Sequence, residues 1–182
     1  VLYREVETST VFSAKQLGSK CDDIFSDVSG SMWNCSNKSE IKKYSELTKQ
    51  TNESVIMARD ISRILSNEIG YSECIESLWI YCGASDTIIN TQGSFNINTF
   101  YHASVEENSD ISYQEFISLI TTDSKFKLVP LGKSNWYLIV NRSMCTKQRG
   151  FTDTTFIGVI RKDYITRSFE EIADTYNMDV IR

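Results

Sequence analysis

The chain has 182 residues, of which 41% are hydrophobic and 24% charged, and its formal net charge at pH 7 is −5. This size suits one domain, or one domain with a helical extension, and leaves enough apolar residues for a buried core. The negative charge argues against a nucleic-acid-binding face, which needs basic residues to neutralise phosphates.

Residues 1–70 have the pattern of helices. Between Leu2 and Met32, apolar residues recur mainly every three or four positions, which places them along one stripe of a helix. Gly30 and the polar residues 34–37 interrupt the stripe, and a second helical stretch covers residues 39–68 with a break or cap at 51–54. We expect these helices to form a stalk that also covers the following domain.

Residues 71–176 form the second predicted region. Runs of β-branched, aromatic and apolar residues predict strands at 77–82, 87–91, 126–129, 135–144 and 154–161, the first two joined as a hairpin. A short amphipathic helix is expected at 112–122, and a last helix should be capped by Asp163 and run through Tyr176. Residues 177–182 are interpreted as the start of a following, truncated segment.

Short links between successive strands predict an antiparallel sheet. A sheet of this size needs one face covered, and the long N-terminal helix is the available cover. The expected fold class is therefore α+β, with long N-terminal helices packed on a five-stranded antiparallel sheet.

Residue patterns of catalysis and of metal or nucleotide binding are missing from the sequence. His102 is the only histidine, and its neighbours show no signature of a base-nucleophile pair. No glycine-rich phosphate loop and no CxxC pair is present, so we expect no cofactor and no metal. The chain is therefore predicted not to be an enzyme, and a hydrolase that uses His102 is the least favoured alternative.

Five cysteines leave at least one thiol unpaired. We interpret them as small buried hydrophobic residues, although one disulfide is possible in an oxidising compartment. The sequence does not name the pair.

Two stretches carry a resemblance to a known family. The first joins IESLWIY (residues 75–81) to SDTIINTQGS (85–94), and the second is FIGVI (156–160), followed by Asp163 and a helix. This arrangement resembles the Cache (PAS-like) extracellular sensors, above all the ectodomains of Gram-positive regulators with a cytoplasmic AraC-type helix-turn-helix and of related histidine kinases.

The resemblance implies an extracytoplasmic sensing domain of a membrane-anchored signalling protein with a PAS-like sheet. Flanking membrane spans, absent from this chain, would connect it to an AraC-type transcription regulator; a histidine kinase or a chemoreceptor is the alternative. The expected location is the cell membrane, on its extracytoplasmic side. The partner would be a small extracellular ligand, and this segment would bind no nucleic acid. A protein-interaction module without a small ligand is the other open reading.

Aromatic and polar residues in the predicted sheet region suggest where such a ligand binds. The expected ligand-binding residues are Tyr101, His102, Trp136, Tyr137, Asn141 and Arg142. Amino-acid-binding members of the family carry an arginine just before the tryptophan of an R-x-W-Y word, whereas this chain has Ser134-Asn135-Trp136-Tyr137. In place of that arginine, Arg142 or Arg149 is the candidate to bind a ligand carboxylate. The alternative interpretation is that these aromatic residues only fill the hydrophobic core.

The apolar stripe of the first helix also favours a parallel homodimer, because a stalk helix alone leaves that face exposed.

Overall fold

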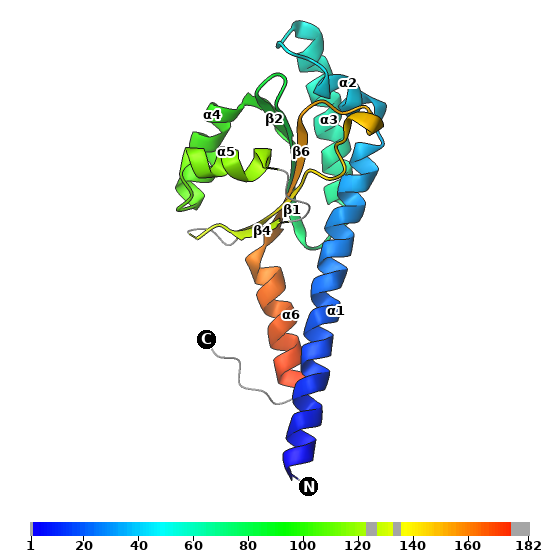
Figure 1. Cartoon of the computed structure of the whole chain (residues 1–182), viewed down its shortest axis with the longest axis vertical. Helices are drawn as coiled ribbons and strands as arrows, with labels where there is room; N and C mark the ends of the chain where they lie inside the picture. Colours follow the sequence, from blue (N-terminus) through cyan, green and yellow to red (C-terminus); the bar gives the residue numbers. More distant parts are fainter. Residues whose placement is uncertain (1, 123–126, 133–135, 176–182) are drawn as a thin grey trace.

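The computed structural model describes residues 2–122, 127–132 and 136–175. Within these residues, six α-helices accompany one six-stranded antiparallel sheet with strand order β3-β2-β1-β6-β5-β4 (Figure 1). The α+β class and the antiparallel pairing are confirmed. The predicted strand number of five is wrong.

The six strands fall into two hairpin groups joined by the central β1–β6 pair. The first group contains β1 (Ile75–Cys82), β2 (Thr87–Asn90) and β3 (Gly93–Asn96). The second contains β4 (Lys127–Pro130), β5 (Trp136–Asn141) and β6 (Thr154–Arg161). Pairing of β1 with β6 brings the two halves of the domain together, with Leu78 opposite Gly158.

The sixth strand, β3, was missed because its sequence carries little strand signal. Its four residues include a glycine, a serine and an asparagine, all of which disfavour or weakly favour strands. Gly93 has φ +143°, a backbone conformation that side-chain-bearing residues rarely adopt, and it turns the chain back along β2. Pairing with β2, rather than intrinsic propensity, therefore makes this edge strand.

Three helices precede the sheet: α1 (Leu2–Ser36), α2 (Ser39–Ser45) and α3 (Asn52–Ile69). The expected interruption at Gly30 and Asn34 is wrong, since α1 continues through both. The expected cap at 51–54 is confirmed: Thr51 and Ser54 form a reciprocal capping box at the start of α3. Gly70 is the C-cap of α3.

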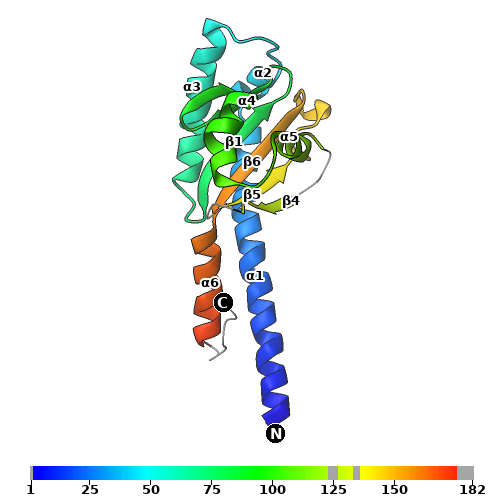
Figure 2. The same ribbon diagram turned by 90° about the vertical axis from the view of Figure 1, so that its left-hand side faces the viewer.

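One face of the sheet packs against α1, α2 and α3 (Figures 1 and 2). Leu78, Ile80 and Ile160 point to this side and join Val28 and Met32 of α1 in a single buried cluster. Strand alternation sends the intervening residues to the opposite face.

The opposite face is covered by residues 97–121, which follow β3. They form α4 (Ile97–Phe100), a π-helical turn (η1, Tyr101–Val105), a 3-10 turn (η2, Glu106–Asn108) and α5 (Tyr113–Thr121). The predicted helix at 112–122 is thus confirmed as α5, with Ser112 as its N-cap. Trp79, Ile157 and Val159 belong to the buried cluster on this side.

The last helix, α6 (Lys162–Thr175), follows β6 directly and lies beside α1 (Figures 1 and 2). Asp163 lies in its first turn and does not cap it, because the helix begins at Lys162. The predicted end at Tyr176 and the segment 177–182 lie outside the described residues. None of the described helices is both long enough and apolar enough to span a bilayer.

Candidate functional site

A cleft of about 300 Å³ opens on the face of the sheet that carries α4 and η1. Its aromatic walls are Trp79, Phe100 and Trp136, and its small apolar residues are Ala103 and Val159. Its polar lining consists of hydroxyl and amide side chains: Ser77, Asn90, Thr91, Gln92, Ser104 and Asn108. Glu76 is the one charged residue among those described that line it. A cleft with aromatic walls and several polar groups is the usual form of a small-ligand site.

The aromatic walls are held by the sheet and by the helical cover. Trp79 lies on β1, its ring meets that of Phe100 edge to face at 4.9 Å, and its Nε1 donates to Ser77 Oγ at 2.9 Å. Trp136 begins β5 opposite Arg161 of β6, and its side chain is half-buried. Two of the three tryptophans of the chain therefore line the same cleft.

The polar wall is built from the β2–β3 turn and the η1–η2 segment. Asn90 Oδ1 accepts from the Gln92 N–H at 2.8 Å, and the Asn90 carbonyl accepts from Ser62 Oγ of α3 at 2.6 Å. On the other side, Asn108 Nδ2 donates to the Ser104 carbonyl at 3.0 Å. These local bonds fix the backbone that presents the polar side chains. The π-helical turn contributes Ala103 and Ser104, and such turns occur frequently at functional sites.

The charged rim connects the cleft to the start of α6. Glu76 Oε2 lies 3.6 Å from Arg161 Nε, and Arg161 is the last residue of β6. Arg161 Nη2 also donates to the Glu73 carbonyl at 2.8 Å. Both members of the ion pair are more than 40% exposed, so the pair contributes little to stability, roughly 0–1 kcal/mol. Its position next to α6 is the more informative feature.

Of the six residues predicted to bind a ligand, the structure places Trp136 in the cleft lining. Tyr137 follows Trp136 on β5, but its side chain packs on the opposite face of the sheet, which α1, α2 and α3 cover. Tyr101, the first residue of η1, is buried, and its hydroxyl donates to the Ile111 carbonyl at 2.6 Å. His102 is exposed, and its Nδ1 lies 2.6 Å from Glu106 Oε2 on the next helical turn.

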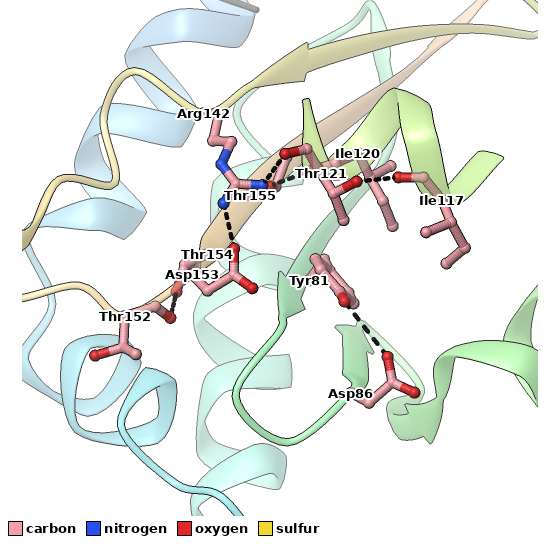
Figure 3. A network of polar contacts seen from close by, with 10 residues as sticks. All are labelled: Tyr81, Asp86, Ile117, Ile120, Thr121, Arg142, Thr152, Asp153, Thr154 and Thr155. Carbon is pink, nitrogen blue, oxygen red and sulfur yellow. Dashed lines mark hydrogen bonds and ion pairs between the residues drawn. The ribbon is translucent and has the colours of Figure 1, made fainter. Parts of the chain in front are cut away.

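Asn141 and Arg142 lie at the other end of β5. Asn141 is buried, its Oδ1 accepts from the Ser143 N–H at 3.1 Å, and its Nδ2 has no hydrogen-bond partner within the described structure. Arg142 donates to the Thr121 carbonyl at the end of α5 and forms an ion pair with Asp153 (Figure 3). These contacts connect α5 to the β5–β6 connection, so the described partners of Arg142 are structural.

The same network includes a second anchor of α5. Thr155 on β6 donates through Oγ1 to the Ile120 carbonyl at 2.6 Å (Figure 3). Nearby, burial and then the Asp86 carboxylate raise the pKa of Tyr81 to about 12, and the Tyr81 hydroxyl donates to Asp86 at 3.4 Å. This tyrosine therefore stays neutral at physiological pH, and its network belongs to the fold rather than to the cleft.

Sequence reasoning missed most of the cleft. Trp79 was assigned only to the strand at 77–82, and Asn90 and Thr91 only to the strand at 87–91; Gln92 was not predicted as a ligand-binding residue. The available signal was the alternation in β1, which separates Trp79 from Leu78 and Ile80, but the sequence alone did not say which face stays open. The η1 contribution had no sequence signal because it depends on a rare helical geometry.

A second cleft of about 480 Å³ lies between α3 and the β2–β3 turn. Arg59, Arg63 and Ser62 line it from α3, and it shares Thr91 and Gln92 with the first cleft. It has no aromatic wall among the described residues, and Arg63 is paired with Asp60 on its own helix. The first cleft is therefore the better candidate site.

The chain matches no protein-family model, and no curated protein matches it significantly. Within the part of the chain that the structure describes, no cluster of three or more His, Cys, Asp or Glu residues is placed to hold a metal ion. All five cysteines are free thiols in the structure.

Proposed function

We propose that this chain is the extracytoplasmic ligand-sensing domain of a membrane-anchored signalling protein of the Cache type. The observation that carries the proposal is the position of the cleft. Its rim residue Glu76 is paired with Arg161, which directly precedes α6, and α6 runs beside α1 away from the sheet (Figures 1 and 2). A ligand in this cleft would touch the residues that set the direction of α6.

The terminal helices suit transmission toward a membrane. Both α6 and the N-terminal part of α1 extend from the same end of the sheet and lie side by side. Tyr164 and Ile165 in the first turn of α6 pack with the same buried cluster as Ile24 and Phe25 of α1. A shift of the β6–α6 junction would therefore change how the two helices pack.

The mechanism is a shift between two arrangements of the α1–α6 pair. A ligand changes this equilibrium only to the extent that it binds one arrangement more tightly than the other. The Glu76–Arg161 contact is the element that would differ between them, because it is exposed, energetically weak and shared by the cleft rim and the helix junction. An AraC-type regulator as the cytoplasmic effector is proposed from the resemblance of residues 75–94 and 156–160, and the parallel homodimer stays a prediction.

The test is hydrogen exchange on the 182-residue chain after a thermal-shift screen of small extracellular metabolites. A stabilising compound should raise the melting temperature, and amide protection should change in residues 162–171 as well as at the cleft. Glu76→Gln, which removes the ion pair with Arg161, should reduce the protection change in α6 relative to the change at the cleft. The matched control is Glu107→Gln, an exposed acid on η2 that does not line the cleft. Protection changes confined to the cleft in the unmodified chain would refute the coupling.

A further inference from the structure

We infer that the cleft binds a neutral polyhydroxylated molecule, a small saccharide or similar polyol, rather than a carboxylate. This inference rests on the proposed function and adds the chemical class of the ligand. The first argument is charge. No lysine, arginine or histidine is among the described residues that line the cleft, and its one acid, Glu76, already faces Arg161 outside the lining. A carboxylate ligand would lose hydration without gaining a cationic partner at the wall.

The second argument is hydrogen bonding. The hydroxyls of Thr91 and Ser104 and the side-chain amide of Gln92 make no hydrogen bond to another described residue, and all three belong to the lining. Hydroxyls and amides each offer both a donor and an acceptor. A sugar hydroxyl also offers both, so a polyol can satisfy such a wall at several points without any charge.

The third argument is the aromatic wall. Trp136 lines the cleft and is half-buried, whereas Trp79 and Phe100 are buried and meet edge to face. A half-buried indole offers an apolar platform for the C–H face of a sugar ring. Quaternary ammonium ligands are typically held in a cage of several aromatic rings, whereas this cleft presents one indole that is not already buried. Such a ligand would also have to draw Glu76 away from Arg161, so an organic cation is disfavoured.

The fourth argument is size. A volume of about 300 Å³ lies at the lower end of the roughly 300–1,000 Å³ found for ligand pockets. This room suits a monosaccharide or a disaccharide that leaves one end in solvent. The adjoining cleft along α3, reached across Thr91 and Gln92, provides space for a further residue of a longer chain.

The experiment compares three probe classes on the 182-residue chain by intrinsic fluorescence and calorimetry. The neutral probes are D-glucose, D-galactose, L-rhamnose and maltose; the carboxylates are succinate and L-glutamate; the cation is choline. We expect at least one neutral probe to bind and to change tryptophan emission, because two of the three tryptophans line the cleft. The carboxylates and choline should bind at least tenfold more weakly.

Two pairs of variants locate the binding. Trp136→Ala should weaken saccharide binding about tenfold, whereas Trp33→Ala, which removes a half-exposed tryptophan of α1, should not. Since Trp136→Ala also removes packing, Gln92→Ala provides a second variant in an exposed turn, with an expected loss of about three- to tenfold. Its control is Gln114→Ala on the exposed face of α5.

The outcomes separate the two levels of the proposal. Preferential binding of succinate, glutamate or choline that depends on Trp136 would overturn the saccharide inference and leave the sensing function standing. Binding of a saccharide that is equally strong in Trp136→Ala and Gln92→Ala would also overturn the inference, because the site would lie elsewhere. Failure of all seven probes at 10 mM would overturn the inference, and failure of the wider metabolite screen as well would remove the sensing function.

Discussion

Replacement of Gly158 by alanine tests the packing of α1 on the sheet. Gly158 lies on β6 opposite Leu78, on the face that α1 covers. A Cβ at this position would come within 2.7 Å of Val28 Cγ1 and 3.1 Å of Met32 Cε. The first distance is shorter than real Cβ contacts, so either Val28 or the whole helix must move.

The expected effect of Gly158→Ala is a loss of about 1–2 kcal/mol in the free energy of unfolding. Overpacking of a well-filled core costs about 1–3 kcal/mol. Alanine offsets about 0.4–1 kcal/mol of this by restricting the unfolded chain. At about 2–4 °C per kcal/mol for a chain of this size, the melting temperature should fall by about 2–8 °C.

Urea denaturation followed by circular dichroism measures this loss, and the control lies on the contacting helix. Gly30 of α1 is exposed, and a Cβ there meets nothing within 4 Å, so Gly30→Ala should stabilise by up to about 1 kcal/mol. In a double-mutant cycle, Val28→Ala should reduce the loss caused by Gly158→Ala. A neutral or stabilising Gly158→Ala, together with no coupling to Val28, would refute the close approach of α1.

The remaining predictions concern capping, thiols and pH. Thr51→Ala should lower the free energy of unfolding by about 1 kcal/mol, because it removes the capping box of α3. Thr51→Ser keeps a hydroxyl and should retain most of that stability. Urea titration of both variants measures the difference. Burial raises the pKa of Cys35 to about 12 and that of Cys74 to about 11. At pH 8, a thiol reagent should therefore modify half-exposed Cys21 first and the buried thiols only after unfolding. Rapid labelling of Cys35 in the folded chain would contradict its burial. These raised pKa values mean that the folded state holds the thiol protons more tightly than the unfolded state does. Their contribution to the free energy of unfolding is complete below about pH 9 and is lost as the pH rises toward 11–12. The urea midpoint should therefore fall above pH 9, and a midpoint that stays constant from pH 8 to 10.5 would refute this linkage.

Much of the secondary structure follows from the sequence because its signals are local. The strands at 77–82, 87–91 and 154–161 and the helix at 112–122 were predicted from residue type and periodicity, and the structure has β1, β2, β6 and α5 there. The capping residues Thr51 and Ser112 mark helix starts by hydrogen bonds that involve only neighbouring residues. Such features need no knowledge of the tertiary fold.

The features that were missed depend on tertiary contacts. β3 exists because β2 offers it an edge, and α1 continues through Gly30 because Val28 and Met32 on the same turns are buried against the sheet. A helix that gains this burial tolerates one glycine, whose cost is about 1 kcal/mol. Local propensity could not reveal either result.

The candidate site was predictable only in part for a related reason. Aromatic residues are typical both of ligand-binding walls and of hydrophobic cores, so residue type alone does not distinguish the two. In the structure, Tyr101 lies in the core and Trp136 lines the cleft. Arg142 was a reasonable carboxylate clamp by residue type, but its donors are used by Thr121 and Asp153. Which polar groups remain available depends on contacts between distant segments, and these were absent from the sequence pattern.

The segment before β1 connects the parts that the proposed sensor would couple. Ser72 donates to Asp27 of α1 at 2.5 Å, and the Glu73 carbonyl accepts from Arg161, the last residue of β6, which directly precedes α6. The two residues thus join both terminal helices to the strand that carries Glu76 and Trp79. With 35 residues, α1 is about 52 Å long, roughly twice the length of the eight-residue β1. Because α1 extends so far past the sheet, a small rotation at this junction would be magnified at its distant end.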